Sequence, residues 1–168
     1  NVIPSILDKY RVFAYNFEDE NKTAKPYWRD IGTLDSYYDA SMDLVSVSPV
    51  FNLYDMDWPI RTYQGQYPPA KNVFAEPEEN GRMGVALDSI VSGGCIISGG
   101  KVVRSLLSPN VRLHSYSLVE ESILFNNINI GRHAKIKKAI IDKNVTIPEN
   151  FEIGYNLEED KKKFFVTP

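Results

Sequence analysis

The sequence has little cysteine, no excess of positive charge and no long apolar run. Cys95 is the one cysteine among 168 residues, so no disulfide framework can form within the chain, and a reducing, cytoplasmic setting is expected. The formal net charge is −3, whereas nucleic-acid-binding domains normally carry a basic balance. No apolar run approaches the length of a membrane span, and the first residues do not read as a signal peptide. We therefore expect a cytoplasmic protein that binds neither nucleic acid nor membrane.

The sequence also lacks a methionine at position 1. We expect from this that the chain begins inside a larger protein. Hydrophobic residues make up 43% of the chain and aromatic residues 12%. These values are typical of a folded globular protein and not of a disordered one.

Residues 87–154 carry an internal repeat. Four triplets recur at steps of 16, 17 and 17 residues: Ser89-Ile90-Val91, Ser105-Leu106-Leu107, Ser122-Ile123-Leu124 and Ala139-Ile140-Ile141. Within each step, two apolar residues separated by one position return every five or six residues. These pairs are Cys95-x-Ile97, Val111-x-Leu113, Tyr116-x-Leu118, Ile128-x-Ile130, Ala134-x-Ile136, Val145-x-Ile147 and Phe151-x-Ile153.

This spacing excludes both an amphipathic helix and a meander of hairpins. The helix would repeat at about 3.6 residues, and the meander would keep a period of two over longer runs. Three short strands in each turn of about 17 residues predict a triangular prism with one strand on each side, which is a parallel β-helix. The hexapeptide form of this coil is usually left-handed, against the general preference for right-handed parallel crossovers.

The residues before the repeat predict a different kind of structure. A short helix is expected from Pro4 to about Lys9, followed by a strand over residues 11–17 that is apolar on both faces and needs a sheet beside it. Nothing in the rest of the chain clearly supplies that sheet. A second helix is expected over residues 34–45, with Thr33 as its N-cap and Ser48-Pro49 as its stop.

Residues 50–80 are rich in proline and aromatic residues. They predict an extended connector that lies on another surface, because tyrosine and tryptophan are rarely left exposed in a free linker. Asn80-Gly81 predicts a turn before the repeat. After Gly154, the charged run 158–163 predicts a helix, and residues 164–166 predict the start of a strand.

Three motifs, taken together and in this order, resemble one enzyme family. They are Tyr27-Trp28-Arg29-Asp30-Ile31-Gly32-Thr33, then Trp58-Pro59-Ile60-Arg61-Thr62-Tyr63 with Pro68-Pro69-Ala70-Lys71, and then Ser89-Ile90-Val91-Ser92-Gly93-Gly94-Cys95. The chain resembles the C-terminal part of bacterial ADP-glucose pyrophosphorylases (glucose-1-phosphate adenylyltransferases) of the enterobacterial type. The resemblance covers nearly the whole chain.

The resemblance implies a fold class and a division of the chain. The fold is mainly β, a left-handed parallel β-helix of hexapeptide repeats preceded by a remnant of an α/β nucleotidyltransferase domain. Residues 1–47 would be the incomplete tail of that domain, residues 48–86 an extended connector and residues 87–168 the β-helix domain.

The resemblance also implies an activity. The whole enzyme would be a homotetramer that uses Mg²⁺ to join ATP and glucose 1-phosphate into ADP-glucose and pyrophosphate, for glycogen biosynthesis. Sugar phosphates and adenine nucleotides would be its effectors. The β-helix would serve oligomerisation and allosteric regulation.

Two residues of the first motif are candidates for the substrate site. Asp30 matches the family's second metal-binding aspartate, and nucleotidyl transfer needs carboxylates to hold Mg²⁺ against the triphosphate. The alternative is that Asp30 caps a helix or pairs with Arg29. Trp28 matches a tryptophan beside the glucose 1-phosphate pocket, although burial in a core is the commoner fate of a tryptophan.

Three further residues match regulatory positions of the family. Pro49 and Gly93 can also be explained as a helix stop and a β-helix corner. Lys143 falls where the family has a basic residue near the effector phosphate, although a lysine on a β-helix corner is usually just solvated. Arg61 and Lys71 are weaker candidates.

The family's glycine-rich phosphate loop and its sugar-phosphate lysine segment are absent from this sequence. Phosphoryl chemistry depends on positioning and neutralising charge around the phosphates, so the chain alone is expected to be inactive, with no complete catalytic set. Two other functions stay open. One is a non-catalytic regulatory or assembly subunit, because flat β-helix sides can pair with another protomer. The other is a hexapeptide acyltransferase with His114 or His133 as its base, although that function gives no role to the connector or the first motif.

Overall fold

The computed structural model describes residues 2–18, 26–57, 59–76 and 81–167. The predictions that involve Trp58, Asn80 and most of the loop 18–25 lie outside the described residues. The described part contains three helices, α1 (Val2–Ile6), α2 (Leu34–Asp43) and α3 (Leu157–Lys163), and all of its strands lie between Lys71 and Ile153. None of these helices has the length and apolar character of a membrane span.

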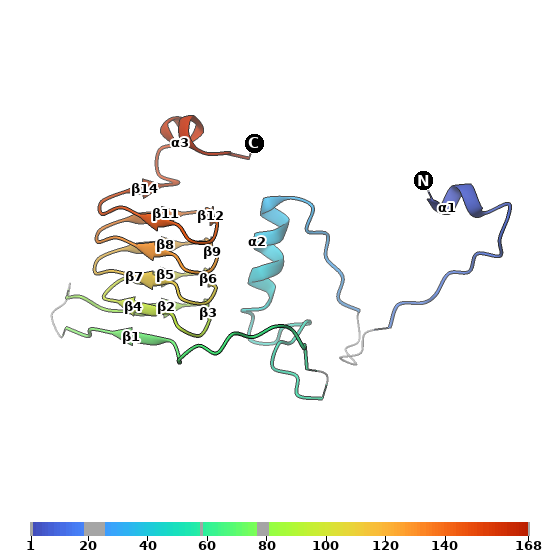
Figure 1. The fold of residues 1–168 in the computed structure, drawn as a ribbon, viewed down its shortest axis with the longest axis horizontal. Helices are drawn as coiled ribbons and strands as arrows, with labels where there is room; N and C mark the ends of the chain where they lie inside the picture. The colour runs from blue at the N-terminus through green and yellow to red at the C-terminus, as the bar shows by residue number, and fades with distance from the viewer. Residues whose placement is uncertain (1, 19–25, 58, 77–80, 168) are drawn as a thin grey trace.

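The strands stack into three parallel sheets that form the sides of a β-helix of about four turns, as the repeat predicts (Figure 1). The first sheet contains β1 (Lys71–Val73), β4 (Ile96–Ser98), β7 (Arg112–Leu113), β10 (Asn129–Ile130) and β13 (Thr146–Ile147). The second contains β2 (Val85–Leu87), β5 (Lys101–Val103), β8 (Leu118–Glu120), β11 (Lys135–Lys137) and β14 (Glu152–Ile153). The third contains β3 (Ile90–Val91), β6 (Leu106–Leu107), β9 (Ile123–Leu124) and β12 (Ile140–Ile141).

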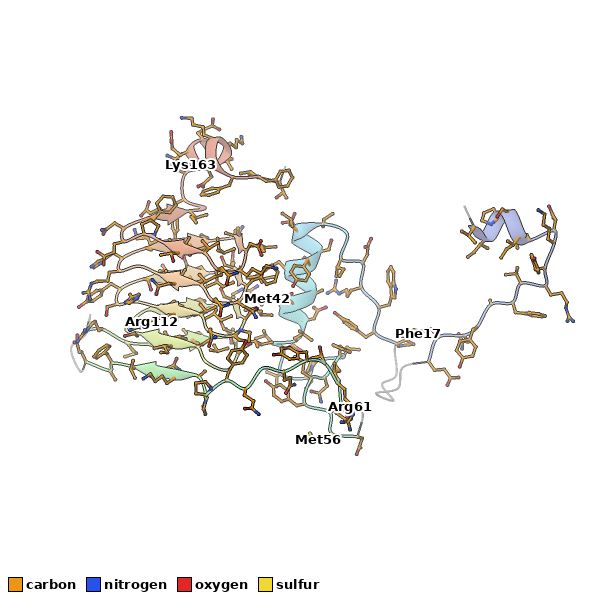
Figure 2. The ribbon with its side chains drawn as sticks, viewed as in Figure 1. Phe17, Met42, Met56, Arg61, Arg112 and Lys163 are labelled. Carbon is orange, nitrogen blue, oxygen red and sulfur yellow. The ribbon has the colours of Figure 1, made fainter. Side chains whose placement is uncertain are left out.

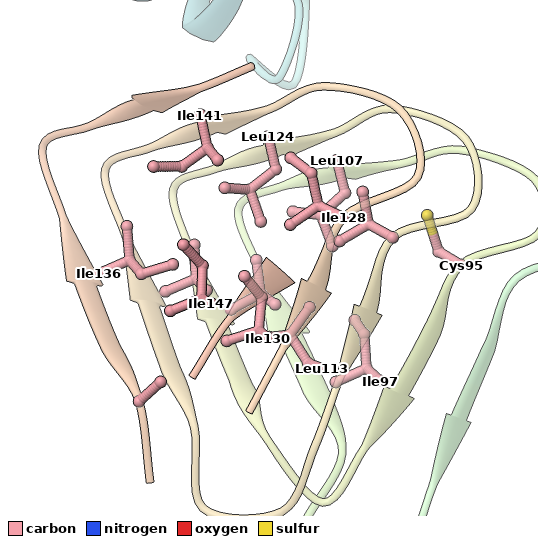
Figure 3. Close-up of a cluster of buried hydrophobic side chains, with 14 of the residues drawn as sticks. Cys95, Ile97, Leu107, Leu113, Leu124, Ile128, Ile130, Ile136, Ile141 and Ile147 are labelled. Atoms are coloured by element: carbon pink, nitrogen blue, oxygen red, sulfur yellow. The ribbon is translucent and has the colours of Figure 1, made fainter. Parts of the chain in front are cut away.

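The interior of the β-helix is a column of aliphatic side chains (Figure 3). Ile130 is representative: it is 0% exposed and pairs in register with Leu113 on one side and Ile147 on the other. Cys95 also lies inside, as predicted, and its Sγ donates to the carbonyl oxygen of Ser108 at 3.2 Å. Burial raises the pKa of the Cys95 thiol.

One predicted pair of inward residues, Tyr116-x-Leu118, is wrong. Tyr116 is 45% exposed, whereas its neighbours Ser115 and Ser117 are buried. Tyr116 has φ of 63° and sits at a corner, and the buried positions continue on either side of it as every second residue.

A ladder of serine hydroxyls replaces aliphatic packing at the corner between the second and third sheets. Each hydroxyl donates to a carbonyl oxygen of its own coil and accepts a backbone N–H from the next coil. Ser89 accepts from Ser105 N at 3.0 Å, Ser105 from Ser122 N at 3.0 Å and Ser122 from Ala139 N at 3.2 Å. The hydroxyls therefore satisfy backbone groups that the corner would otherwise bury without a partner.

Ser105→Ala should destabilise the β-helix by about 1–3 kcal/mol, because the buried N–H of Ser122 loses its acceptor. Ser89→Ala should cost less, since Ser89 is only partly buried and water can replace its hydroxyl. Urea unfolding of the two variants beside the unmodified protein measures the difference. Equal stability of all three would contradict a structural role for the ladder.

The third sheet also presents an apolar outer face. Its outward residues are Ile90, Leu106, Ile123 and Ile140. Ile123 is 0% exposed yet stands outside the interior cluster. Helix α2 lies along this side (Figure 1), and Figure 2 places Met42 between α2 and the β-helix. The Tyr38 hydroxyl donates to the carbonyl oxygen of Arg104 at 2.8 Å, so α2 is anchored to the β-helix.

The N-terminal predictions are only partly correct. Helix α1 ends at Ile6 and not near Lys9, and residues 11–17 are exposed and form no strand. The physical reason is that every strand in the described part of the chain belongs to the β-helix, so this segment has no neighbour to pair with. Helix α2 ends at Asp43, before the predicted stop, because the N–H of Val45 bonds to the Met42 carbonyl at 3.0 Å and tightens the turn.

The C-terminal helix α3 follows the last coil. It covers the predicted run 158–163 and has Asn156 as its N-cap. The buried Asp160 accepts the N–H of Gly154 at 3.0 Å, which ties α3 to the end of the β-helix. Phe164 ends α3 in extended conformation, but the strand predicted over residues 164–166 does not form.

Tyr155 reaches from this end back to an earlier coil, where its hydroxyl donates to Glu120 Oε2 at 3.0 Å. Partial burial and the Glu120 carboxylate raise the pKa of Tyr155 from 10.0 to about 12. A raised pKa means that the folded state favours the protonated phenol, so this contribution to stability is complete below pH 10 and is lost as the pH rises from 10 to 12.

The pH dependence of Tyr155 can be measured directly. The difference between the tyrosinate absorbance titrations of the unmodified protein and Tyr155→Phe should have its midpoint near pH 12. A midpoint near pH 10 would show that the bond to Glu120 does not form in solution.

Candidate functional site

The first motif is fixed to both ends of helix α2. At the start of the helix, Thr33 has extended backbone and its Oγ1 accepts the N–H of Ser36 at 3.1 Å. This confirms the predicted N-cap. At the last turn, the Asp43 carboxylate receives three hydrogen bonds from the motif. Arg29 donates from Nε to Oδ2 at 2.8 Å and from Nη2 to Oδ1 at 2.9 Å, and the Tyr27 hydroxyl donates to Oδ2 at 3.1 Å.

The electrostatics of this cluster agree with its geometry. Burial, followed by the hydrogen bond to Asp43, raises the pKa of Tyr27, so its hydroxyl stays protonated and keeps donating. The same carboxylate raises the pKa of Arg29. The Tyr27 ring also stacks on Phe51, with ring centroids 5.5 Å apart, which joins the start of the connector to the cluster.

A hollow of about 330 Å³ lies beside the cluster. It is lined by Pro26, Tyr27, Trp28, Arg29, Asp43, Ser46, Ser48 and Val50. Trp28 lies at the rim of this hollow and is 77% exposed, so it is not buried in a core in the described structure. Pro49 is half-buried, and its neighbours in the sequence, Ser48 and Val50, both line the hollow.

Asp30 bonds to its own segment. Its Oδ1 accepts the N–H of Gly32 at 3.0 Å, and Arg29 pairs with Asp43 instead, so the alternative of an Asp30–Arg29 pair is wrong. Asp30 is exposed, and a carboxylate oxygen is the kind of ligand that Mg²⁺ prefers. Among the described residues, no three acidic, histidine or cysteine side chains are grouped to hold a metal.

The two β-helix candidates share one corner, between the third and first sheets. The strand register places Gly93, Pro109, Asn126 and Lys143 at equivalent positions of successive coils. With about 4.8 Å between adjacent coils, Gly93 and Lys143 are about 14 Å apart along the corner.

The same corner carries an asparagine ladder one residue further along. Asn110 Nδ2 donates to Asn127 Oδ1 at 3.2 Å, and Asn127 Nδ2 donates to Asn144 Oδ1 at 3.0 Å. All three asparagines have φ near 60°, and Gly94 has φ of 77° at the same position in the first coil. Asparagine and glycine are the residues that tolerate this left-handed backbone best. The regular spacing of these asparagines is a sequence signal of the corner that the repeat of apolar residues does not include.

Lys143 borders a second hollow, of about 390 Å³, at the end of this corner that is nearest the C-terminus. Its lining residues are Phe125, Asn126, Asn127, Asp142, Lys143 and Asn144. Gly93 lies at the opposite end of the corner, where the connector docks. There the N–H of Gly94 donates to the Pro68 carbonyl at 2.6 Å. A side chain at position 93 would place its Cβ 3.1 Å from Cβ of Tyr67. Gly93 therefore permits close approach of the connector.

The remaining candidates have simpler surroundings. His114 Nε2 is 3.0 Å from Asn129 Oδ1, and the His133 ring stacks on Tyr116 with centroids 4.9 Å apart. Arg61 is an exposed residue of the connector, and Lys71 begins β1, opposite Ile96 in β4. The first sheet of the β-helix thus starts before the repeat that is visible in the sequence.

The structure therefore sorts the candidates into two groups. Trp28 and Asp30 lie on the segment fixed to α2, with Pro49 beside the hollow next to it, and Gly93 and Lys143 lie on one β-helix corner. Sequence reasoning missed Asp43, which organises the first group. Its partners are 14 and 16 positions away, and no periodicity links them.

Comparison with known proteins agrees with these observations. Residues 68–168 match the family model described as GlmU-like, C-terminal hexapeptide. A glucose-1-phosphate adenylyltransferase of Koribacter versatilis is 59% identical over 167 residues, covering 99% of this chain and 39% of the relative. Those of Methylococcus capsulatus and Dechloromonas aromatica are 53% and 49% identical, each covering 100% of this chain, with 39% and 38% of the relative.

The chain thus spans about 39% of the length of these relatives, and it corresponds to their C-terminal portion. This confirms the resemblance on which the three motifs agree. The chain belongs to the GlmU-like C-terminal hexapeptide family, in the form found in glucose-1-phosphate adenylyltransferases.

Proposed function

We propose that this chain is the assembly and regulatory part of a bacterial glucose-1-phosphate adenylyltransferase, together with one edge of its substrate site. The whole protein joins ATP and glucose 1-phosphate into ADP-glucose and pyrophosphate. The observation that carries this proposal is the 59% identity to a protein of that name across 99% of the chain. The similarity extends beyond the β-helix, which by itself occurs in proteins of many activities.

The proposed substrate edge is the segment that bears Trp28 and Asp30. Asp30 would be one ligand of a Mg²⁺ ion, which supplies positive charge against the phosphates of ATP. The exposed Trp28 ring offers an apolar face of the kind on which a sugar can stack. Arg29 keeps its charge paired with Asp43 and so has a structural role.

The proposed regulatory surface is the corner that bears Gly93 and Lys143. The ammonium group of Lys143 beside the hollow at residues 125–127 suits the phosphate of a sugar phosphate or an adenine nucleotide. Gly93 would act through the connector that docks on it. Pro49 would act through the turn that leads from α2 to this connector.

The flat sides of the β-helix are proposed to assemble the whole enzyme into a tetramer. On the outer face of the second sheet, the apolar residues Val85 and Leu118 share one register position with Lys101 and Lys135, so apolar and charged side chains adjoin there as they do in many interfaces. The third sheet is covered in part by α2 and is therefore the least suited to assembly.

The test is an adenylyltransferase assay on the whole protein that carries this sequence. Release of pyrophosphate from ATP and glucose 1-phosphate in the presence of Mg²⁺, changed by added sugar phosphates or AMP, is the expected result. The isolated chain of 168 residues should show no turnover. If the whole protein has no such activity, the chain is better explained as a non-catalytic assembly subunit.

A further inference from the structure

We propose that Asp43 is a positioning residue for the substrate edge: its carboxylate, by binding Arg29 and Tyr27, holds Trp28 and Asp30 in place. The inference rests on the proposed function for its effect on catalysis. The structural part of the inference, that Asp43 fixes the motif, rests only on the hydrogen bonds.

The motif is held at two points of one helix. Thr33 caps the first turn of α2, and Asp43 is in the last. Nine helical residues, 34–42, lie between the two, which corresponds to a rise of about 15 Å from Thr33 to Asp43. The motif is therefore attached at two separate points of one rigid helix, through Arg29 and through Thr33. The residues between these attachments, 30–32, are confined.

The contacts to Asp43 fix the residues on either side of Trp28. Tyr27 and Arg29 both bond to the Asp43 carboxylate, so the backbone of Trp28 lies between two held residues and Asp30 directly follows the second. The side chains of Trp28 and Asp30 stay accessible: Trp28 is 77% exposed and Asp30 is exposed as well. One carboxylate on α2 thus positions the backbone that carries the two candidate substrate residues.

The contact is specific for a carboxylate. Arg29 binds both oxygens of Asp43 in the paired geometry that makes arginine–carboxylate contacts directional. The ion pair is partly exposed, with 33% of the Asp43 side chain accessible, so it contributes little to overall stability. Its main effect is orientation, and losing it should change function more than folding.

The experiment uses the whole protein with Asp43→Asn. Asparagine keeps the size of the side chain but cannot give Arg29 two carboxylate oxygens. We expect kcat/KM for glucose 1-phosphate to fall about tenfold, and the Mg²⁺ concentration for half-maximal rate to rise by a similar factor, because displacements of about 1 Å have effects of this order or larger. The midpoint of thermal unfolding should stay nearly unchanged.

A second readout does not depend on activity. Hydrogen exchange of the peptide that spans residues 26–36 should be faster in Asp43→Asn, because the Gly32 and Ser36 amides lie in the held segment. Peptides of the β-helix should exchange as before. Asp43→Glu, which restores the carboxylate, should recover part of both effects.

Two further variants make the test specific. Asp39→Asn removes an exposed carboxylate one turn earlier on the same helix and should change neither readout. Adding Arg29→Gln to Asp43→Asn should cause little further loss if Asp43 acts through Arg29.

The inference fails if Asp43→Asn leaves exchange over residues 26–36 unchanged, or if exchange rises while the kinetic constants do not move. A whole protein that makes no ADP-glucose would overturn the proposed function instead, and the exchange result would still decide whether Asp43 holds the motif.

Discussion

Replacing Ile130 by aspartate is expected to unfold the β-helix. Ile130 is 0% exposed and lies between Leu113 and Ile147 in the first sheet. Burying a carboxylate among aliphatic side chains with no partner costs several kcal/mol or more. The free energy of unfolding of a whole domain is only about 5–15 kcal/mol, so this one substitution removes most of it.

The position of Ile130 increases the effect. Coils of a β-helix contact only their neighbours, and stability depends on the interfaces between them. A coil disrupted at β10 separates β1, β4 and β7 of the first sheet from β13, and neither group has a complete core. The variant should therefore lose most of its β-sheet circular dichroism signal at room temperature.

Thr146→Asp is the matched control. Thr146 is exposed in the same sheet, on the neighbouring strand, directly opposite Asn129. It should change the melting temperature only slightly, because the new carboxylate stays in water. A melting curve of Ile130→Asp that matches the unmodified protein would refute the assignment of inward and outward positions.

The second large effect is expected from Asp30→Asn in the whole protein. Turnover at a fixed Mg²⁺ concentration should fall about 100-fold or more, because the proposed metal loses an anionic ligand and with it several kcal/mol of charge stabilisation. Stability should hardly change. The asparagine oxygen can still accept the N–H of Gly32, so the local turn survives.

The two effects can be separated by measuring rates over a range of Mg²⁺ concentrations and unfolding on the same preparations. Asp35→Asn is the control, since Asp35 is an exposed carboxylate in the first turn of α2. Near-normal activity of Asp30→Asn at limiting Mg²⁺ would remove Asp30 from the metal site.

The β-helix was predictable because its cause is local and repeated. Each coil must place apolar residues inward and turn-forming residues at three corners, so the pattern returns every 16 or 17 residues. The exception, Tyr116, shows the limit of this reasoning: the pattern of apolar residues cannot tell an inward tyrosine from one that sits at a corner with positive φ.

The structure outside the repeat was less predictable for two different reasons. The strand expected over residues 11–17 needs a partner strand, and the described part of the chain gives it none. The link from Arg29 and Tyr27 to Asp43 is a tertiary contact between residues with no shared pattern. Residue types in the motif pointed to Trp28 and Asp30, but only the fold brings in the residue that orients them.

The central claim is that this chain works as the C-terminal part of a larger enzyme. The most direct test is the mass of the native polypeptide in source cells, measured with an antibody raised against residues 87–154. The account predicts a band at more than twice the 19.1 kDa of this chain. A band at 19 kDa alone would contradict it and would identify a β-helix that acts without a catalytic half.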